Sequence, residues 1–180
     1  MKTRLISVLF LAGILLAFIG EVQAQSSNRA SPVSDFSYDL SSRGDGVKIT
    51  KYTGRGGAVV IPSTIEDMPV IEIGLTAFSA NRYHDQPAYN ITSIVIPASI
   101  KYIGSTAFSF CERLTSVTIQ GTGVVIAGRA FYNCTELTSL TFPEGENSIA
   151  PEYANADSFL GCQKLPLRVR QQLRNMGFGF

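Results

Sequence analysis

The segment IPASIKYIGSTAFSFCERLTSVTI, residues 96–119, decides the fold, because its spacing of apolar residues recurs along the chain. RLTSVTIQGTGVVIAGRAFYNC from Arg113 and ELTSLTFPEGENSIA from Glu136 align with it, and AVVIPSTIEDMPVIEIGLTAFSAN from Ala58 supplies a further copy. The shared unit is 23 residues long, and the departures from this length read as loop insertions. Self-similarity at such a period is typical of a solenoid of stacked copies.

The equivalent apolar positions of the copies form columns that we expect to be buried. Each copy opens with a strand pattern such as LTSVTI, turns, and returns along the opposite wall in a second apolar stretch. One copy cannot bury its apolar side alone, so the copies must stack. The columns are Ile91, Leu114, Leu137 and Leu165; Ile94, Val117 and Leu140; Ile96, Ile119 and Phe142; Ile103, Ile126 and Ile149; and Phe108, Phe131 and Phe159, joined by Val59, Ile61, Ile73 and Phe78 of the first copy.

The pattern therefore predicts a β-rich solenoid of about four copies, with a cap at each end to cover the exposed core. Residues 58–165 hold the repeats, and residues 36–57 read as an N-terminal β-hairpin cap. Its strands alternate at Phe36, Tyr38 and Leu40 and at Val47 and Ile49, around the turn SSRGDG.

Residues 166–180 read as a short helical cap. Pro166 suits a first helical turn, Leu173 and its neighbours Val169 and Met176 recur at helical spacing, and Gly177 suits the stop. Four basic residues and no acid lie between residues 163 and 180. This cap could touch an anionic surface, although a solvated helix face explains the same charges.

The N-terminus resembles a secretory signal peptide, residues 1–24. Lys2 and Arg4 precede an uncharged apolar run, residues 5–20, that is shorter than the roughly 20 residues of a membrane span, and Val22-Gln23-Ala24 suits cleavage. An uncleaved anchor is the alternative. We expect an exported protein, in the periplasm, on the cell surface or secreted, with no integral membrane segment after cleavage and a flexible lead-in over residues 25–35.

The charges exclude a nucleic-acid binder, because 15 Lys and Arg stand against 14 Asp and Glu. Loss of residues 1–24 removes Lys2, Arg4 and Glu21, which leaves a mature chain of zero formal charge. A partner must then be recognised through shape, apolar contact or local charge.

The three cysteines share one repeat position. Cys111, Cys134 and Cys162 each lie three residues after a repeat phenylalanine, which favours a ladder of free, buried thiols. A disulfide between neighbours remains open, since export favours disulfides. The only histidine, His84, lies in the insertion RYHDQPAY without a second ligand or catalytic partner. We therefore expect no catalytic residue, metal site or cofactor, and no enzyme.

These repeats resemble the BspA-like, treponemal type of leucine-rich repeat, whose pattern runs IPxxVxxIGxxAFxxCxxLxxVxI and which residues 96–119 match almost position for position. The resemblance extends from Phe36 to Phe180. It implies an exported or surface-exposed protein with a role in adhesion to host matrix proteins or other cells. It says little about the ligand.

The outward strand residues are the candidate ligand-binding surface, which we expect to be the concave face. They form two uncharged columns, suited to an extended peptide or a broad protein face, although good strand formers would occupy these positions in any case. The columns are Ala58, Ser93, Ser116 and Ser139, and Val60, Val95, Thr118 and Thr141.

Arg43-Gly44-Asp45 is a possible integrin-binding loop motif, although Asp45-Gly46 is also a pair that a hairpin turn favours. The sequence as a whole predicts a binding module for an extracellular matrix or cell-surface protein. The alternative is a periplasmic or envelope scaffold with no host ligand.

Overall fold

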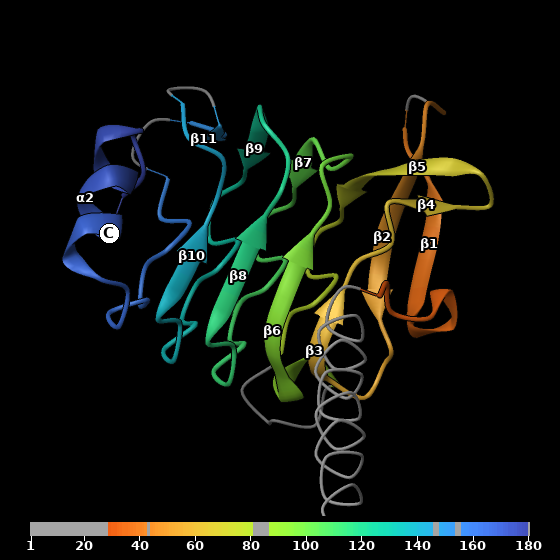
Figure 1. Ribbon diagram of the computed structural model, residues 1–180, viewed down its shortest axis with the longest axis horizontal. Helices are drawn as coiled ribbons and strands as arrows, with labels where there is room; N and C mark the ends of the chain where they lie inside the picture. The colour runs from red at the N-terminus through yellow and green to blue at the C-terminus, as the bar shows by residue number, and fades with distance from the viewer. Residues whose placement is uncertain (1–28, 43, 81–86, 146–147, 154–155, 180) are drawn as a thin grey trace, which may run out of the picture.

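The computed structural model is a two-walled β-solenoid (Figure 1), and it describes residues 29–42, 44–80, 87–145, 148–153 and 156–179. The front sheet faces the viewer and contains four parallel strands, in the order β10 (Ser139–Thr141), β8 (Ser116–Ile119), β6 (Ile91–Ile96) and β3 (Gly57–Val60). The solenoid of about four copies is therefore confirmed.

The back sheet runs in the order β1-β2-β5-β7-β9-β11. Its strands are β1 (Phe36–Leu40), β2 (Val47–Tyr52), β5 (Met68–Ile73), β7 (Tyr102–Ile103), β9 (Val124–Ile126) and β11 (Ile149–Pro151), and the short β4 (Thr64–Ile65) pairs with β5. A 3-10 helix, η2 (Pro87–Asn90), precedes β6.

The predicted columns hold in the front sheet. Val117 pairs with Ile94 on one side and with Leu140 on the other, and Val59 pairs with Ile94. All four side chains are at most 5% exposed. The alternation of the LTSVTI pattern thus places every second strand residue in the core between the two sheets.

The predicted column of Ile103, Ile126 and Ile149 is wrong at its last member. Ile103 pairs with Ile126, but Ile126 pairs with Pro151, and Ile149 pairs with Val124. The turn before β11 is therefore two residues longer than the alignment of Ile149 with Ile126 assumes. Ile149 remains in the core because its true neighbour, Val124, is buried as well.

One phenylalanine from each turn joins a continuous stack in the core. The ring centroids of Phe78 and Phe108 lie 4.8 Å apart, those of Phe108 and Phe131 4.9 Å, and those of Phe131 and Phe159 5.2 Å. These spacings match the separation of neighbouring strands, about 4.7–4.9 Å. All four rings are fully buried. The stack therefore follows the same repeat as the backbone.

The stack is closed by aromatic rings at both ends. Tyr52 of β2 stacks on Phe78 at 5.3 Å, and Phe36 of β1 meets Phe78 edge-on at 6.2 Å. At the other end Phe178 meets Phe159 edge-on, at 5.3 Å and 79°. Both caps thus continue the core rather than merely shielding it.

The N-terminal cap is an antiparallel hairpin of β1 and β2, as predicted, with an irregularity between Ser37 and Tyr38. Leu40, which we expected to alternate with the buried residues, is 59% exposed. The two strands cover the first rung of the core through Phe36 and Tyr52.

The lead-in that we expected to be flexible is built into the fold from Ser31 onwards. The Ser31 amide donates to the carbonyl of Val60 at 2.8 Å, and its hydroxyl accepts from the Val60 amide at 3.1 Å. A 3-10 helix, η1 (Val33–Asp35), follows. These contacts satisfy the edge strand β3, which would otherwise expose unpaired backbone groups. Residues 25–28 and the predicted signal peptide lie outside the described residues.

The C-terminal cap is the helix α2 (Leu167–Asn175), preceded by Pro166 as predicted. It ends where Gly177 adopts a φ of 92°, with the Gly177 amide bonded to the Arg174 carbonyl and the Phe178 amide bonded to the Leu173 carbonyl. This pair of bonds is the glycine-dependent stop of a Schellman motif. It turns the chain back so that Phe178 reaches the core.

We expect Phe131→Ala to lower the free energy of unfolding by about 3–5 kcal/mol, because it removes a ring from the middle of the stack and leaves a cavity. Denaturant unfolding followed by circular dichroism would measure the change. Leu75→Ala is the matched control, since Leu75 is 66% exposed, and should change little. Equal stability of the Phe131 variant and the wild type would contradict the stacked core.

Candidate functional site

The structure brings the two predicted ligand-binding columns together on the outer face of the front sheet. Ser116 pairs with Ser93 and Ser139, and Thr118 pairs with Val95 and Thr141. Ala58 and Val60 continue the columns on β3. Ala58, Ser139 and Thr141 are exposed and the others are half-buried.

Threonine hydroxyls tie neighbouring turns together on this face. The Thr115 hydroxyl donates to the carbonyl of Thr92 at 2.9 Å, and the Thr138 hydroxyl donates to the carbonyl of Thr115 at 3.2 Å. In the second predicted column the Thr141 hydroxyl donates to that of Thr118 at 3.1 Å. These contacts restrict the rotamers, so the face would lose little conformational entropy when a partner binds.

Charged residues border this face and do not enter the columns. On the segment before the strands, Arg113 donates to the Asn90 amide oxygen at 3.0 Å, and Lys164 donates to both carboxylate oxygens of Glu136, at 2.6 and 2.7 Å. The centre of the face is therefore neutral, and such a surface suits an extended backbone or a broad protein face better than an anion.

The surface hollows that the described residues form lie elsewhere. One, of about 330 Å³, lies beside Asp45, Glu72 and Tyr102 on the back sheet, and another, of about 270 Å³, lies beside Arg129. Partial burial, together with a hydrogen bond to Glu152, raises the pKa of Tyr102 to about 12, so this phenol stays protonated near neutral pH. A small-molecule site on the front face has no support from these hollows.

The possible integrin motif lies in the hairpin turn of the N-terminal cap. Its Asp45 carboxylate accepts a hydrogen bond from the Ser41 hydroxyl at 2.7 Å, and the Gly44 amide donates to the Ser41 carbonyl at 2.9 Å. Arg43 lies outside the described residues. The local contacts of Gly44 and Asp45 are those of a turn, which favours the structural interpretation of this tripeptide.

The three cysteines form the predicted ladder and are free and buried. Each thiol donates to the carbonyl of the phenylalanine one turn earlier: Cys111 to Phe78 at 3.1 Å, Cys134 to Phe108 at 3.2 Å and Cys162 to Phe131 at 3.1 Å. Burial raises the pKa of the Cys111 thiol to about 12 and raises that of Cys134 as well. A thiolate nucleophile is therefore disfavoured at these positions.

His84 lies outside the described residues, so the prediction that it has no ligand or catalytic partner stays a prediction. In the part of the chain that the structure describes, three or more metal-ligating side chains nowhere come together. The nine residues of α2 fall well short of a bilayer span, and no other described helix reaches that length.

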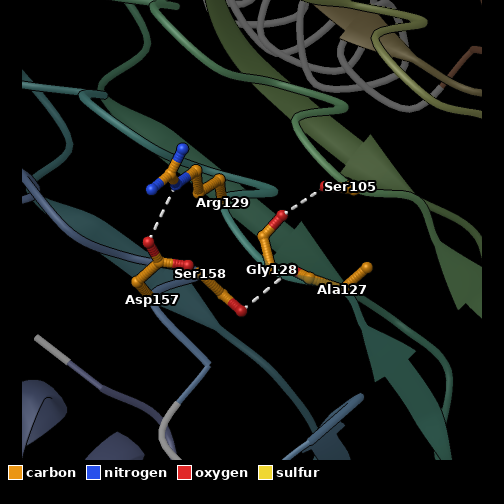
Figure 2. Close-up of polar contacts among 6 residues, drawn as sticks. All are labelled: Ser105, Ala127, Gly128, Arg129, Asp157 and Ser158. Atoms are coloured by element: carbon orange, nitrogen blue, oxygen red, sulfur yellow. Dashed lines mark hydrogen bonds and ion pairs between the residues drawn. The ribbon is translucent and has the colours of Figure 1, made fainter.

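A polar cluster on the segment that crosses from the back sheet to the front sheet was missed by the sequence analysis (Figure 2). The Arg129 side chain forms an ion pair with Asp157 at 2.9 Å, the Ser158 hydroxyl donates to the Ala127 carbonyl at 2.9 Å, and the Ser105 hydroxyl donates to the Gly128 carbonyl at 2.8 Å. Arg129 also lies over the Tyr132 ring, 5.7 Å from its centroid. The signal was available in the repeat alignment, where Arg129 and Asp157 stand at the same position, two residues before Phe131 and Phe159.

Comparison with known proteins supports the repeat assignment. The family described as "BspA type Leucine rich repeat region (6 copies)" matches residues 76–171. No curated protein matches the sequence.

Three solved structures resemble the fold. The leucine-rich repeat protein TpLRR of T. pallidum has a TM-score of 0.60 at 21% identity, over 83% of this chain and 97% of that one. A leucine-rich cell surface protein of Faecalibacterium prausnitzii has a TM-score of 0.59 at 30% identity, over 76% of this chain and 35% of that one. A leucine-rich repeat protein of Bacteroides capillosus has a TM-score of 0.58 at 24% identity, over 75% and 93%. The first and third show the fold alone.

We expect all three thiols to resist alkylation in the folded protein, because burial excludes the reagent and, at Cys111 and Cys134, a raised pKa also keeps the thiol protonated at pH 8. Mass spectrometry after iodoacetamide treatment should show no adduct on the native protein and three after denaturation. Ser139→Cys, which places a thiol at an exposed position, should add one native adduct as the positive control. Rapid native labelling of the wild type would show that the ladder opens.

Proposed function

The chain belongs to the BspA type leucine-rich repeat family, and from this membership we propose that it is an exported, non-enzymatic module that binds a protein outside the cytoplasm. The partner that we propose is an extracellular matrix protein or a protein of another cell surface. The binding site is the outer face of the front sheet, through Ser93, Val95, Ser116, Thr118, Ser139 and Thr141.

The observation that carries this proposal is the register of the two uncharged columns. Four parallel strands place residues of the same small size side by side, and hydroxyl contacts such as Thr141 to Thr118 hold them in place. A flat, rigid and neutral surface offers a protein partner a contact with little desolvation cost, because no charge must be stripped of water. The cell surface protein of Faecalibacterium prausnitzii, at 30% identity, has the location that we propose for this chain.

An envelope scaffold with no host ligand is the second candidate. The four basic residues between residues 163 and 180 favour it, because they could contact an anionic envelope component. Lys164 is already paired with Glu136, which reduces the charge that this end presents.

We expect Ser116→Arg combined with Thr118→Glu to abolish partner binding, because long charged side chains would stand in the middle of the face. Binding would be measured by surface plasmon resonance against a panel of extracellular matrix and cell-surface proteins. The melting temperature should fall only slightly, since the substitutions leave the core intact and the hydroxyl contact of Thr141 with Thr118 contributes about 0.5–1.5 kcal/mol at most.

Ser42→Arg combined with Thr122→Glu is the matched control, because it introduces the same charges at two exposed positions outside the front sheet. It should bind as the wild type does. Retained binding by the Ser116 and Thr118 variant would move the site away from the front sheet.

Cell fractionation separates the two candidates. The adhesin-type module should be found on the cell surface or in the medium, where external protease digests it on intact cells. The envelope scaffold should be found in the periplasm and become protease-sensitive only after the outer layer is opened. A cytoplasmic location with an uncleaved N-terminus would contradict both.

A further inference from the structure

Arg129 is held in one orientation by two neighbours. Its Nε donates to Oδ2 of Asp157 at 2.9 Å, and its guanidinium lies 5.7 Å from the centroid of the Tyr132 ring. Arg129 itself has a left-handed φ of 59°, as do Thr76 and Thr106 at the same place in the preceding turns, with φ values of 56° and 55°. The turn therefore directs the Arg129 side chain outward. Asp157 and Tyr132 hold it there before any other protein binds.

The donors of Arg129 are only partly used. The hydrogen bond to Asp157 comes from Nε, so the two terminal nitrogens are not part of it. Figure 2 shows this contact, with Asp157 below the guanidinium and one terminal nitrogen directed upward, away from it. The side chain is 62% exposed, whereas that of Asp157 is 31% exposed. The two terminal nitrogens of an oriented guanidinium can donate two parallel hydrogen bonds to a planar anion, and we call this pair of donors the fork.

A hollow of about 270 Å³ lies beside this fork. It is lined by Ser105, Gly128, Arg129, Tyr153 and Asp157. Gly128 allows Tyr153 to approach this turn closely, because a Cβ atom there would collide with the phenol oxygen of Tyr153. The Tyr153 hydroxyl thus lies close to the turn that carries Arg129 and offers another donor to a group that enters the hollow.

Apolar and aromatic groups flank the fork on its other side. Phe110 meets Tyr132 edge-on at 5.4 Å, and Leu160, one turn along from Tyr132, is 37% exposed. Arginine and tyrosine next to partly exposed apolar side chains are the composition of a protein-binding hot spot. The front face, by contrast, offers no charge in its columns.

We propose that the hollow beside Arg129 binds the carboxylate of a Glu or Asp side chain on a partner protein, with the apolar residues next to that side chain packing on Tyr132 and Leu160. A carboxylate fits because the two terminal nitrogens of the guanidinium can donate two parallel hydrogen bonds to it while Nε keeps its bond to Asp157. This site lies outside the front sheet and does not depend on the function proposed above.

The test uses the full chain and a synthetic acetylated peptide, Gly-Leu-Glu-Leu-Gly amide, with its Gln counterpart. Titration followed by ¹⁵N-resolved NMR should shift the Arg129 Nε–H and Tyr132 resonances, and the Glu peptide should bind about tenfold tighter than the Gln peptide. Methyl glucuronide, which carries the same group on a sugar, should bind more weakly than the Glu peptide because it cannot use the apolar flank.

Arg129→Lys keeps the charge and removes the fork, so it should lose most of the preference for Glu over Gln. Tyr153→Phe removes one hydroxyl and should weaken both the peptide and the glucuronide. Arg113→Gln is the matched control, because Arg113 is also exposed and bonded to a neighbour, Asn90, and it should leave binding unchanged. Thermal melts of each variant check folding.

Four results would overturn the proposal: no shift with the Glu peptide at millimolar concentration, equal binding of the Glu and Gln peptides, an unchanged preference in Arg129→Lys, or tighter binding of the glucuronide. The Ser116 and Thr118 double variant should bind the Glu peptide normally, so failure of this site and failure of the front-face site are distinguishable.

Discussion

The stacking of one phenylalanine per turn is the constraint on which the structure depends. A single turn has an apolar side on both walls and nothing within itself to cover it, so each ring needs the rings above and below it to complete its burial in the core. Phe108, between Phe78 and Phe131, has neighbours at 4.8 and 4.9 Å. The backbone follows the same interval, since the Phe108 amide donates to the Ala130 carbonyl at 2.7 Å while its carbonyl accepts from the Cys134 thiol. The two ends then require caps, and Tyr52 and Phe178 supply them.

Most of this arrangement follows from the sequence because it is repeated. Once the phenylalanine and isoleucine columns are aligned, the two sheets, the cysteine ladder and the outward columns follow from the alternation of strand side chains. The helical cap could be predicted too, because Gly177 and Leu173 carry local signals of a helix end. Local chemistry and periodicity are the two kinds of information that a single sequence expresses well.

The errors fall where neither kind of information applies. The register of β11 depends on the length of the turn before it. An alignment of Ile149 with Ile126 makes this turn two residues too short. Ser31 contacts Val60, which is far from it in the sequence, and Ser31 itself lies outside the repeats, so its polar segment with few core residues is predicted to be flexible. The contact of Arg129 with Asp157 could have been read from the alignment, because the two residues stand at the same repeat position, two before Phe131 and Phe159. Tyr153 could not be placed in the same way, because it lies in the insertion before that position.

Because the ring contacts within the stack are nearly identical, the fold does not require a particular number of turns. The inner rings meet one another at nearly the same distance, while only the terminal rings meet a cap. Duplication or deletion of one whole 23-residue unit in the gene would lengthen or shorten both sheets and leave each cap with the neighbour it already has. A change of another length is tolerated only in a turn, as before β11, because within a strand it would move the later side chains to the opposite face.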